Sequence, residues 1–235
     1  MALLHRADLV PSKLDLIGTW APSQPWFVGD AASGFTTVAN FRFDDPEGEV
    51  GVETLLVRAG AGPILQIPLT YRNAPLAGAE ASLLGTMQHS VLGERWTYDA
   101  TGDPVYLQTL ATAALTGGRQ ADLLIEIDGA MTQRKPTAVV QGSGGAGAPV
   151  PVLPTVASIL SRNEGASTIL DADGLHIELA RVPDGGEPLR SDDGDATLTG
   201  TWIDHPETAV LATVSFPAPT TPAPLRHQQG SSQEK

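Results

Sequence analysis

The chain has 235 residues and a formal net charge of −13 at pH 7, and 41% of its residues are hydrophobic. This length supports a substantial core in one large or two small domains. Its 14 Lys and Arg residues are scattered, which argues against nucleic-acid binding, and the absence of cysteine excludes disulfides and thiolate chemistry.

The first ten residues, MALLHRADLV, carry charges at Arg6 and Asp8 that interrupt any apolar run, so they do not form a signal peptide. No window approaches the ~20 apolar residues of a membrane span. The acidic balance also disfavours anionic membrane surfaces. We therefore expect a cytoplasmic protein that binds neither membranes nor nucleic acid.

The N-terminal third predicts one helix and a three-stranded antiparallel meander. The helix covers Leu14–Trp20, with Ser12 or Asp15 near its start and Pro22 after its end. Three extended segments follow, of which the first alternates apolar and polar residues. Pro68 lies inside the last of them and predicts an edge strand or a bulge. The three strands are Phe35–Phe43, Val50–Arg58 and Pro63–Arg72.

The middle of the chain continues with short extended pieces and a second helix. Leu84–Met87 favours a strand, and Arg95–Asp99 is a further extended piece. Asp103 is a good N-cap before Pro104, and Gly117 and Gly118 end the helix. Its predicted buried side consists of Val105, Leu107, Leu110, Ala114 and Leu115.

The C-terminal half is expected to be strand and turn only. Residues 142–154, GSGGAGAPVPVLP, read as a flexible linker or a long loop and mark a candidate sub-boundary. Asp/Gly turns of hairpin type separate the later strands. Residues 217–235 have almost no apolar content, which predicts a disordered tail. The expected strands are Ala121–Asp128, Thr137–Gln141, Ser167–Leu170, Leu175–Val182, Ala196–Ile203 and Ala209–Phe216.

Together these elements predict an α+β fold, in which a curved antiparallel sheet carries one or two packed helices. The later strands add a second β-rich set, which we expect to join the same body because four short strands need a partner face. Residues 1–216 then form a single domain. Two similar halves are the alternative.

The strongest candidate site lies between residues 89 and 103. An acid–base pair would need its polar side chains to converge in a cleft. The structural interpretation is favoured: Asp103 caps the helix, the tyrosine packs with its hydroxyl bonded, and the histidine bonds the backbone. The candidate binding residues are His89, Arg95, Trp96, Tyr98, Asp99 and Asp103.

Other patterns offer little chemistry. The aromatic residues Trp26, Tyr71, Trp96, Tyr98 and Tyr106 could form a sugar-stacking platform, but packing in the core is the favoured interpretation. The Asp runs 171–174 and 192–195 lack the calcium-loop pattern and are typical of turns. No zinc-binding helix, hydrolase elbow or phosphate loop is present, so we expect no metal and no cofactor.

Several segments resemble a known family. LDLIGTWAPSQPWFVGD is similar to the opening of actinobacterial maltokinases. FRFDDPEGEVGVETLLVR, LQIPLTYRNAPL and GTMQHSVLGERWTYD resemble stand-alone maltokinase-cap-like proteins of actinobacteria. The resemblance covers roughly residues 14 to 216. In the kinases it implies an N-terminal cap of curved antiparallel sheet that leans over a phosphotransferase lobe.

The resemblance implies the fold of the cap without the chemistry of the kinase. A catalytic-loop Asp followed by an Asn is missing from the sequence. We therefore expect a non-catalytic interaction or regulatory protein that binds a protein partner in α-glucan or trehalose metabolism, or a second copy of itself. The alternative is a small-molecule or carbohydrate-binding protein, with or without weak enzymatic activity, that uses residues 89–103.

Overall fold

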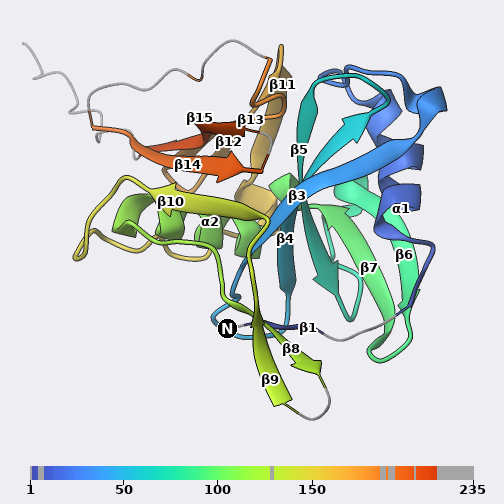
Figure 1. Cartoon of the computed structure of the whole chain (residues 1–235). Coiled ribbons are helices and arrows are strands. Elements are labelled where there is room, and N and C mark those ends of the chain that lie inside the picture. The colour runs from blue at the N-terminus through green and yellow to red at the C-terminus, as the bar shows by residue number, and fades with distance from the viewer. Residues whose placement is uncertain are drawn as a thin grey trace, which may run out of the picture.

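A computed structural model describes residues 2–4, 8–127, 130–185, 189, 194–203 and 205–215. Two curved six-stranded antiparallel sheets lie side by side, with helix α2 between them and helix α1 on the outer face of one sheet (Figure 1). The predicted α+β class with a curved antiparallel sheet is confirmed. The tail 217–235 lies outside the described residues.

The first sheet contains the predicted meander as β3, β4 and β5, and β3 has the predicted bounds. The strands β7, β6 and β2 extend the sheet beyond β5. In order across the sheet, the strands are β2 (Leu9–Val10), β6 (Leu83–His89), β7 (Gly93–Asp99), β5 (Ile64–Arg72), β4 (Gly51–Ala59) and β3 (Phe35–Phe43).

Helix α1 (Lys13–Trp20) packs on the outer face of this sheet. Ser12 and Asp15 form a capping box, in which each side chain accepts a hydrogen bond from the other residue's backbone. Ile17, Trp26, Val57 and other buried residues form a small core beneath the helix. Both faces of β4 and β5 are therefore covered, which explains their long apolar runs.

Pro68 lies in an internal strand, so the predicted edge position or bulge is wrong. Its strand, β5, pairs with β4 over residues 64–71 and with β7 only over residues 69–72. Before that point the backbone N–H of Gln66 donates to the carbonyl oxygen of Arg181 at 2.8 Å. On this side of β5, the residues before Pro68 contact Arg181, just beyond β13, and the residues after it pair with β7. Pro68 lies between the two contacts, where a residue without an N–H costs no strand hydrogen bond.

The second sheet arises from the later part of the chain. Its β12–β13 hairpin turns at Asp173 and Gly174, whose φ angles of 48° and 82° are left-handed, as the predicted Asp/Gly turn requires. The strand β11 was not predicted. In order across the sheet, the strands are β10 (Ala138–Gly142), β14 (Ala196–Trp202), β15 (His205–Ser215), β13 (Leu175–Ala180), β12 (Ser167–Ala172) and β11 (Leu160–Glu164).

A three-stranded sheet projects from the body at the bottom of Figure 1. Its strand β1 (Ala2–Leu4) runs parallel to β8 (Leu123–Ile127), and β8 forms a hairpin with β9 (Ala130–Arg134). Only β8 was predicted. Short 3-10 helices connect several elements at Ala21–Ser23, Ala31–Ser33, Glu80–Ser82, Ala100–Gly102 and Val156–Ser158.

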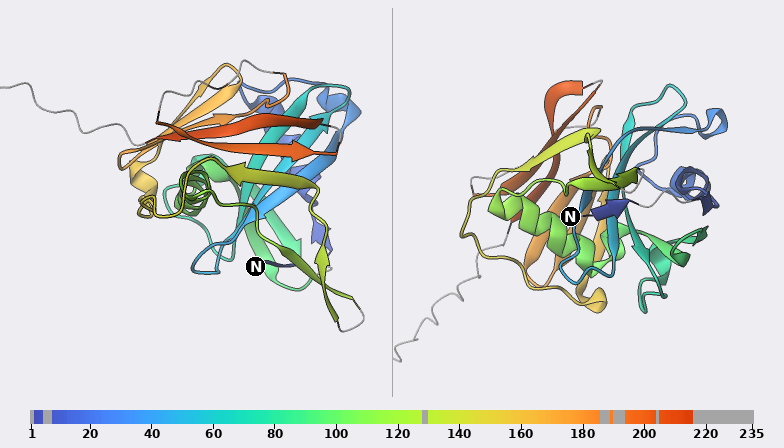
Figure 2. Two further views of the ribbon diagram at one scale, coloured as in Figure 1. Left: turned by 60° about the vertical axis from the view of Figure 1, so that its left-hand side comes forward. Right: turned by 60° about the horizontal axis from the view of Figure 1, so that its bottom comes forward.

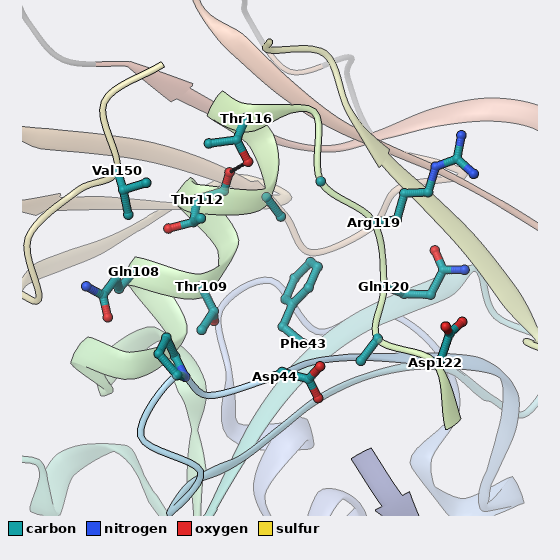
Figure 3. A pocket seen from close by; sticks show the side chains of 14 residues that line it. Phe43, Asp44, Gln108, Thr109, Thr112, Thr116, Arg119, Gln120, Asp122 and Val150 are labelled. Carbon is teal, nitrogen blue, oxygen red and sulfur yellow. Dashed lines mark hydrogen bonds between the residues drawn. The ribbon is translucent and has the colours of Figure 1, made fainter. Parts of the chain in front are cut away.

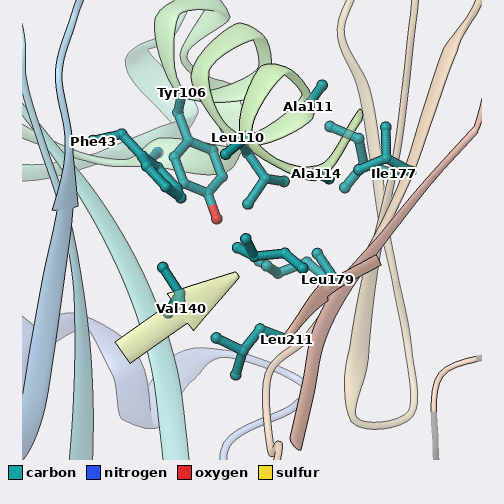
Figure 4. Packing of buried hydrophobic residues seen from close by; sticks show 14 of the residues in the cluster. Phe43, Tyr106, Leu110, Ala111, Ala114, Val140, Ile177, Leu179 and Leu211 are labelled. Carbon is teal, nitrogen blue, oxygen red and sulfur yellow. The ribbon is translucent and has the colours of Figure 1, made fainter. Parts of the chain in front are cut away.

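Helix α2 (Pro104–Thr116) organises the main core. Asp103 is its N-cap and Gly117, with φ of 71°, its C-cap, as predicted. Four of the five predicted buried residues are buried, and Leu115 is half-buried. Figures 2 and 4 show α2 beside the second sheet, where Tyr106, Leu110 and Ala114 face that sheet's side chains. Val52 and Leu56 of β4 join the same cluster, so one core links both sheets.

Residues 142–154 include a packed loop at the end of α2. The N–H groups of Gly144 and Gly145 donate to the carbonyls of Ala114 and Leu115, at 2.9 and 3.1 Å. These carbonyls lie in the last turn of the helix, where no further helical N–H can reach them. The long-loop interpretation therefore describes this segment, and its glycines cap the helix.

Candidate functional site

The predicted site residues are spread along β6, β7 and the start of α2. Side chains alternate in a strand, so Trp96 and Tyr98 lie on one face of β7 and Arg95 and Asp99 on the other. His89 pairs with Gly93, which is three residues, or about 10 Å, from Trp96. The structure therefore does not bring His89, Trp96 and Tyr98 together in one pocket.

His89 stabilises the turn of the β6–β7 hairpin. Its Nδ1 atom accepts hydrogen bonds from the backbone N–H groups of Val91 and Leu92, at 3.2 and 3.1 Å. The Oγ atom of Ser90 accepts a third turn bond from the N–H of Asp8 at 3.0 Å. The histidine thus has the structural role that the sequence favours.

Tyr98 and Asp103 also have structural partners. The buried Tyr98 hydroxyl accepts a hydrogen bond from the N–H of Leu76 at 2.8 Å. Both carboxylate oxygens of Asp103 accept from the Arg72 guanidinium at 2.7 Å, and one also accepts from the N–H of Val105. This bidentate pair attaches the N-terminus of α2 to the first sheet.

Asp99 forms the buried junction between the two sheets. Its carboxylate accepts a 2.7 Å hydrogen bond from Arg181, a residue just beyond β13 whose side chain is 1% exposed. Arg181 also donates to Thr168 at 2.8 Å and lies 4.7 Å from the centre of the Trp26 ring. Because the guanidinium charge of Arg181 is deeply buried, it needs the carboxylate of Asp99 beside it as a counter-charge.

A second buried carboxylate, Glu53 of β4, was missed by the sequence analysis. It accepts hydrogen bonds from Lys13, Asn40 and Tyr71 at 2.5, 2.8 and 2.9 Å. The signal for it was present, because Glu53 stands on the face of β4 that also carries Leu55 and Val57. A lone acid in such a row needs a cationic partner.

Glu53 makes stability depend on acid pH. Burial alone would raise its pKa, but the charges of Lys13 and Arg42 and the hydrogen bonds outweigh burial and lower the pKa from 4.5 to about 2. A depressed folded-state pKa contributes stability that is present above pH 4.5 and lost as the pH falls towards 2. We expect a loss of about 3 kcal/mol across this interval.

Urea unfolding at pH 6 and pH 3 measures the larger part of this loss, about 2 kcal/mol. The variant Glu53→Gln should be less stable at pH 6 and should lose less stability on acidification than the unmodified protein. Equal pH dependence of the two proteins would contradict the assignment.

An open groove lies beside α2. It has a volume of about 430 Å³ and lies between one face of α2, the β3–β4 turn and the segment that follows α2 (Figure 3). Sequence analysis missed it because its lining comes from three separate parts of the chain, and none of the six predicted residues contributes. The lining includes Phe43, Asp44, Gln108, Thr109, Thr112, Thr116, Arg119, Gln120, Asp122 and Val150.

The described residues provide no metal site and no membrane-spanning helix. They contain no group of three or more His, Asp or Glu side chains arranged to hold a metal ion. Within the same part of the chain, no helix is long and apolar enough to cross a membrane.

The five candidate aromatic residues do not form one sugar-stacking platform, since Trp26 and Tyr106 belong to different core clusters.

One region of the chain matches a known protein family. Residues 20–103 match the model of the maltokinase N-terminal cap domain. The match begins at the last residue of α1, contains β3 to β7 and ends at the N-cap of α2. No curated protein matches the chain. The groove lies mostly outside the matched region, whereas the β6–β7 hairpin and the Glu53 cluster lie mostly within it.

Proposed function

We propose that this maltokinase-cap-like protein is a non-catalytic interaction module that binds a separate enzyme of α-glucan or trehalose metabolism, such as a kinase. The matched family is named as an N-terminal domain of maltokinases, which supports a role beside a catalytic partner. The chain carries the cap without the kinase catalytic-loop motif. The cap would then act on a lobe supplied by another polypeptide.

One observation carries the proposal: the β6–β7 hairpin presents apolar side chains to solvent. At its tip Val91 and Leu92 are 56% and 45% exposed. Val10, on the neighbouring strand β2, is 68% exposed at the same end of the sheet. We call these three residues the hairpin patch. Grouped exposed apolar side chains are typical of protein-binding surfaces.

The hairpin is also firmly held, which favours a preformed binding surface. His89 and Ser90 bond the turn and the adjacent strand β2, as described above. The other polar candidates nearby, Asp99 and Asp103, are engaged by Arg181 and Arg72, and each of their carboxylate oxygens already accepts a hydrogen bond within the protein. Binding is therefore better supported than catalysis.

Substitution in the hairpin patch tests the proposal. Candidate partners are recombinant maltokinase and trehalose synthase from the same genome, and binding is measured by calorimetry. The double variant Val91→Asp, Leu92→Asp should weaken binding at least tenfold, since it places two charges in the interface (about 1.4 kcal/mol or more). Its thermal unfolding should not change, because both side chains are exposed.

Val152→Asp is the matched control, because this valine is 87% exposed and lies outside the hairpin. It should bind normally. Light scattering of the free protein tests self-association, and a dimer broken by the hairpin variant would identify a second copy as the partner instead. A monomer that binds none of these enzymes would contradict the proposal.

A further inference from the structure

The groove beside α2 presents both hydrogen-bond acceptors and donors. The hydroxyl of Thr109 donates to the carbonyl of Tyr106 at 3.1 Å, and the hydroxyl of Thr116 donates to the carbonyl of Thr112 at 2.7 Å. Each hydroxyl has one hydrogen, so these two Oγ atoms can only accept further bonds. An occupant that bonds these two Oγ atoms must therefore supply donors, as a hydroxyl group does.

The other polar groups of the lining add both donors and acceptors. The amide nitrogen of Gln108 donates one of its two hydrogens to the carbonyl of Pro151 at 3.1 Å, which leaves one hydrogen and the amide oxygen for a ligand. The Oε1 atom of Gln120 accepts from the N–H of Val140, so its amide nitrogen remains as a donor. One carboxylate oxygen of Asp122 accepts from Gln133, and the second can accept from a ligand. Asp44 adds another carboxylate at the rim.

The lining of the groove combines charges of both signs with an apolar floor. Arg119 lies on the same segment as Asp122, and its Nε atom donates to Gln141 at 2.6 Å. Phe43, Ala113 and Pro46 supply apolar surface, on which the C–H face of a saturated ring can rest. An anion is disfavoured by the two carboxylates and by the net charge of −13.

We propose that this groove binds a small, neutral, polyhydroxylated ring compound, such as a cyclitol or a monosaccharide. Its hydroxyl groups donate to Thr109, Thr116 and Asp122, and its C–H face lies on Phe43. The volume of about 430 Å³ falls in the range of small-molecule sites. This inference does not depend on partner binding, because the hairpin patch lies on β2 and the β6–β7 hairpin and contributes no residue to the groove.

Two-dimensional NMR of the full chain tests the proposal with myo-inositol and glucose as probes. We expect saturable shifts of the α2 and 118–122 amide signals with at least one probe, and a Kd on the order of 1 mM. Because the ligand is neutral, the Kd should be unchanged by added NaCl. Spermidine represents the competing ligand class, the polyamines. If spermidine caused NMR shifts that weakened with added NaCl, and the two polyols caused none, the proposal would be overturned.

Thr116→Val localises the binding. This half-buried residue lines the groove, and valine keeps its shape while removing the hydroxyl. Loss of one hydrogen bond should raise the Kd about fivefold. Thr36→Val, an exposed threonine of β3 outside the groove, should leave the Kd unchanged. Absence of shifts with both polyols, or equal effects of the two variants, would contradict the proposal.

Discussion

Replacing Asp99 by Ala is expected to destabilise the protein by about 3–5 kcal/mol. The variant leaves Arg181 with its guanidinium buried between the sheets and without a counter-charge. Thr101 and Thr168 remain as neutral acceptors, which compensate a buried cation only in part. The loss should appear in urea unfolding at pH 7 as a lower midpoint with little change in slope.

Asp171→Ala is the matched control. Asp171 also bonds an arginine, Arg162 at 2.8 Å, but both side chains are about half exposed on the surface of the second sheet. An exposed pair of this kind contributes about 0–1 kcal/mol. If the two alanine variants lost similar stability, the Asp99–Arg181 pair would not be the buried junction that we describe.

The second large effect is expected for Gly144→Ala. A Cβ atom at this position would lie 1.8 Å from the carbonyl oxygen of Leu115, inside the hard-sphere distance. The obstacle is backbone at the end of α2, so the loop would have to move away and release the carbonyls of Ala114 and Leu115. We expect a destabilisation of about 3 kcal/mol, measured by thermal and urea unfolding.

The adjacent glycine offers a close control. A Cβ atom at Gly145 would meet no atom within 4 Å, so Gly145→Ala should change stability by less than about 0.5 kcal/mol. A flexible linker would tolerate both substitutions equally. A similar, small effect of the two variants would therefore support the linker interpretation and contradict the packed loop.

Local features of the fold were largely predictable from the sequence. The caps of α2 at Asp103 and Gly117, the β3 strand and the Asp173-Gly174 turn all follow from short-range chemistry. Each depends on a few neighbouring residues and on the φ angles that their side chains permit. The same local reasoning identified the structural roles of His89 and Asp103.

Features that depend on distant contacts could not be predicted in this way. Pro68 indicated an edge strand, but β5 is internal because two different neighbours meet on either side of the proline. β11 is exposed at every position and has no alternation to reveal it. The groove joins residues 43–46 to residues 108–122, and no sequence pattern marks that meeting.

The sequence by itself determined the class of the fold, the helix ends, the cap-like character of the first sheet and the absence of a complete catalytic motif. These depend on residue type and spacing along the chain. Only the tertiary structure decided which carboxylates are buried, with Asp99 beside Arg181 and Glu53 beside Lys13, and which surfaces remain open. The physical reason is that burial and charge pairing are set by contacts between residues 40 and 82 positions apart, whose free energy appears only once the sheets have packed.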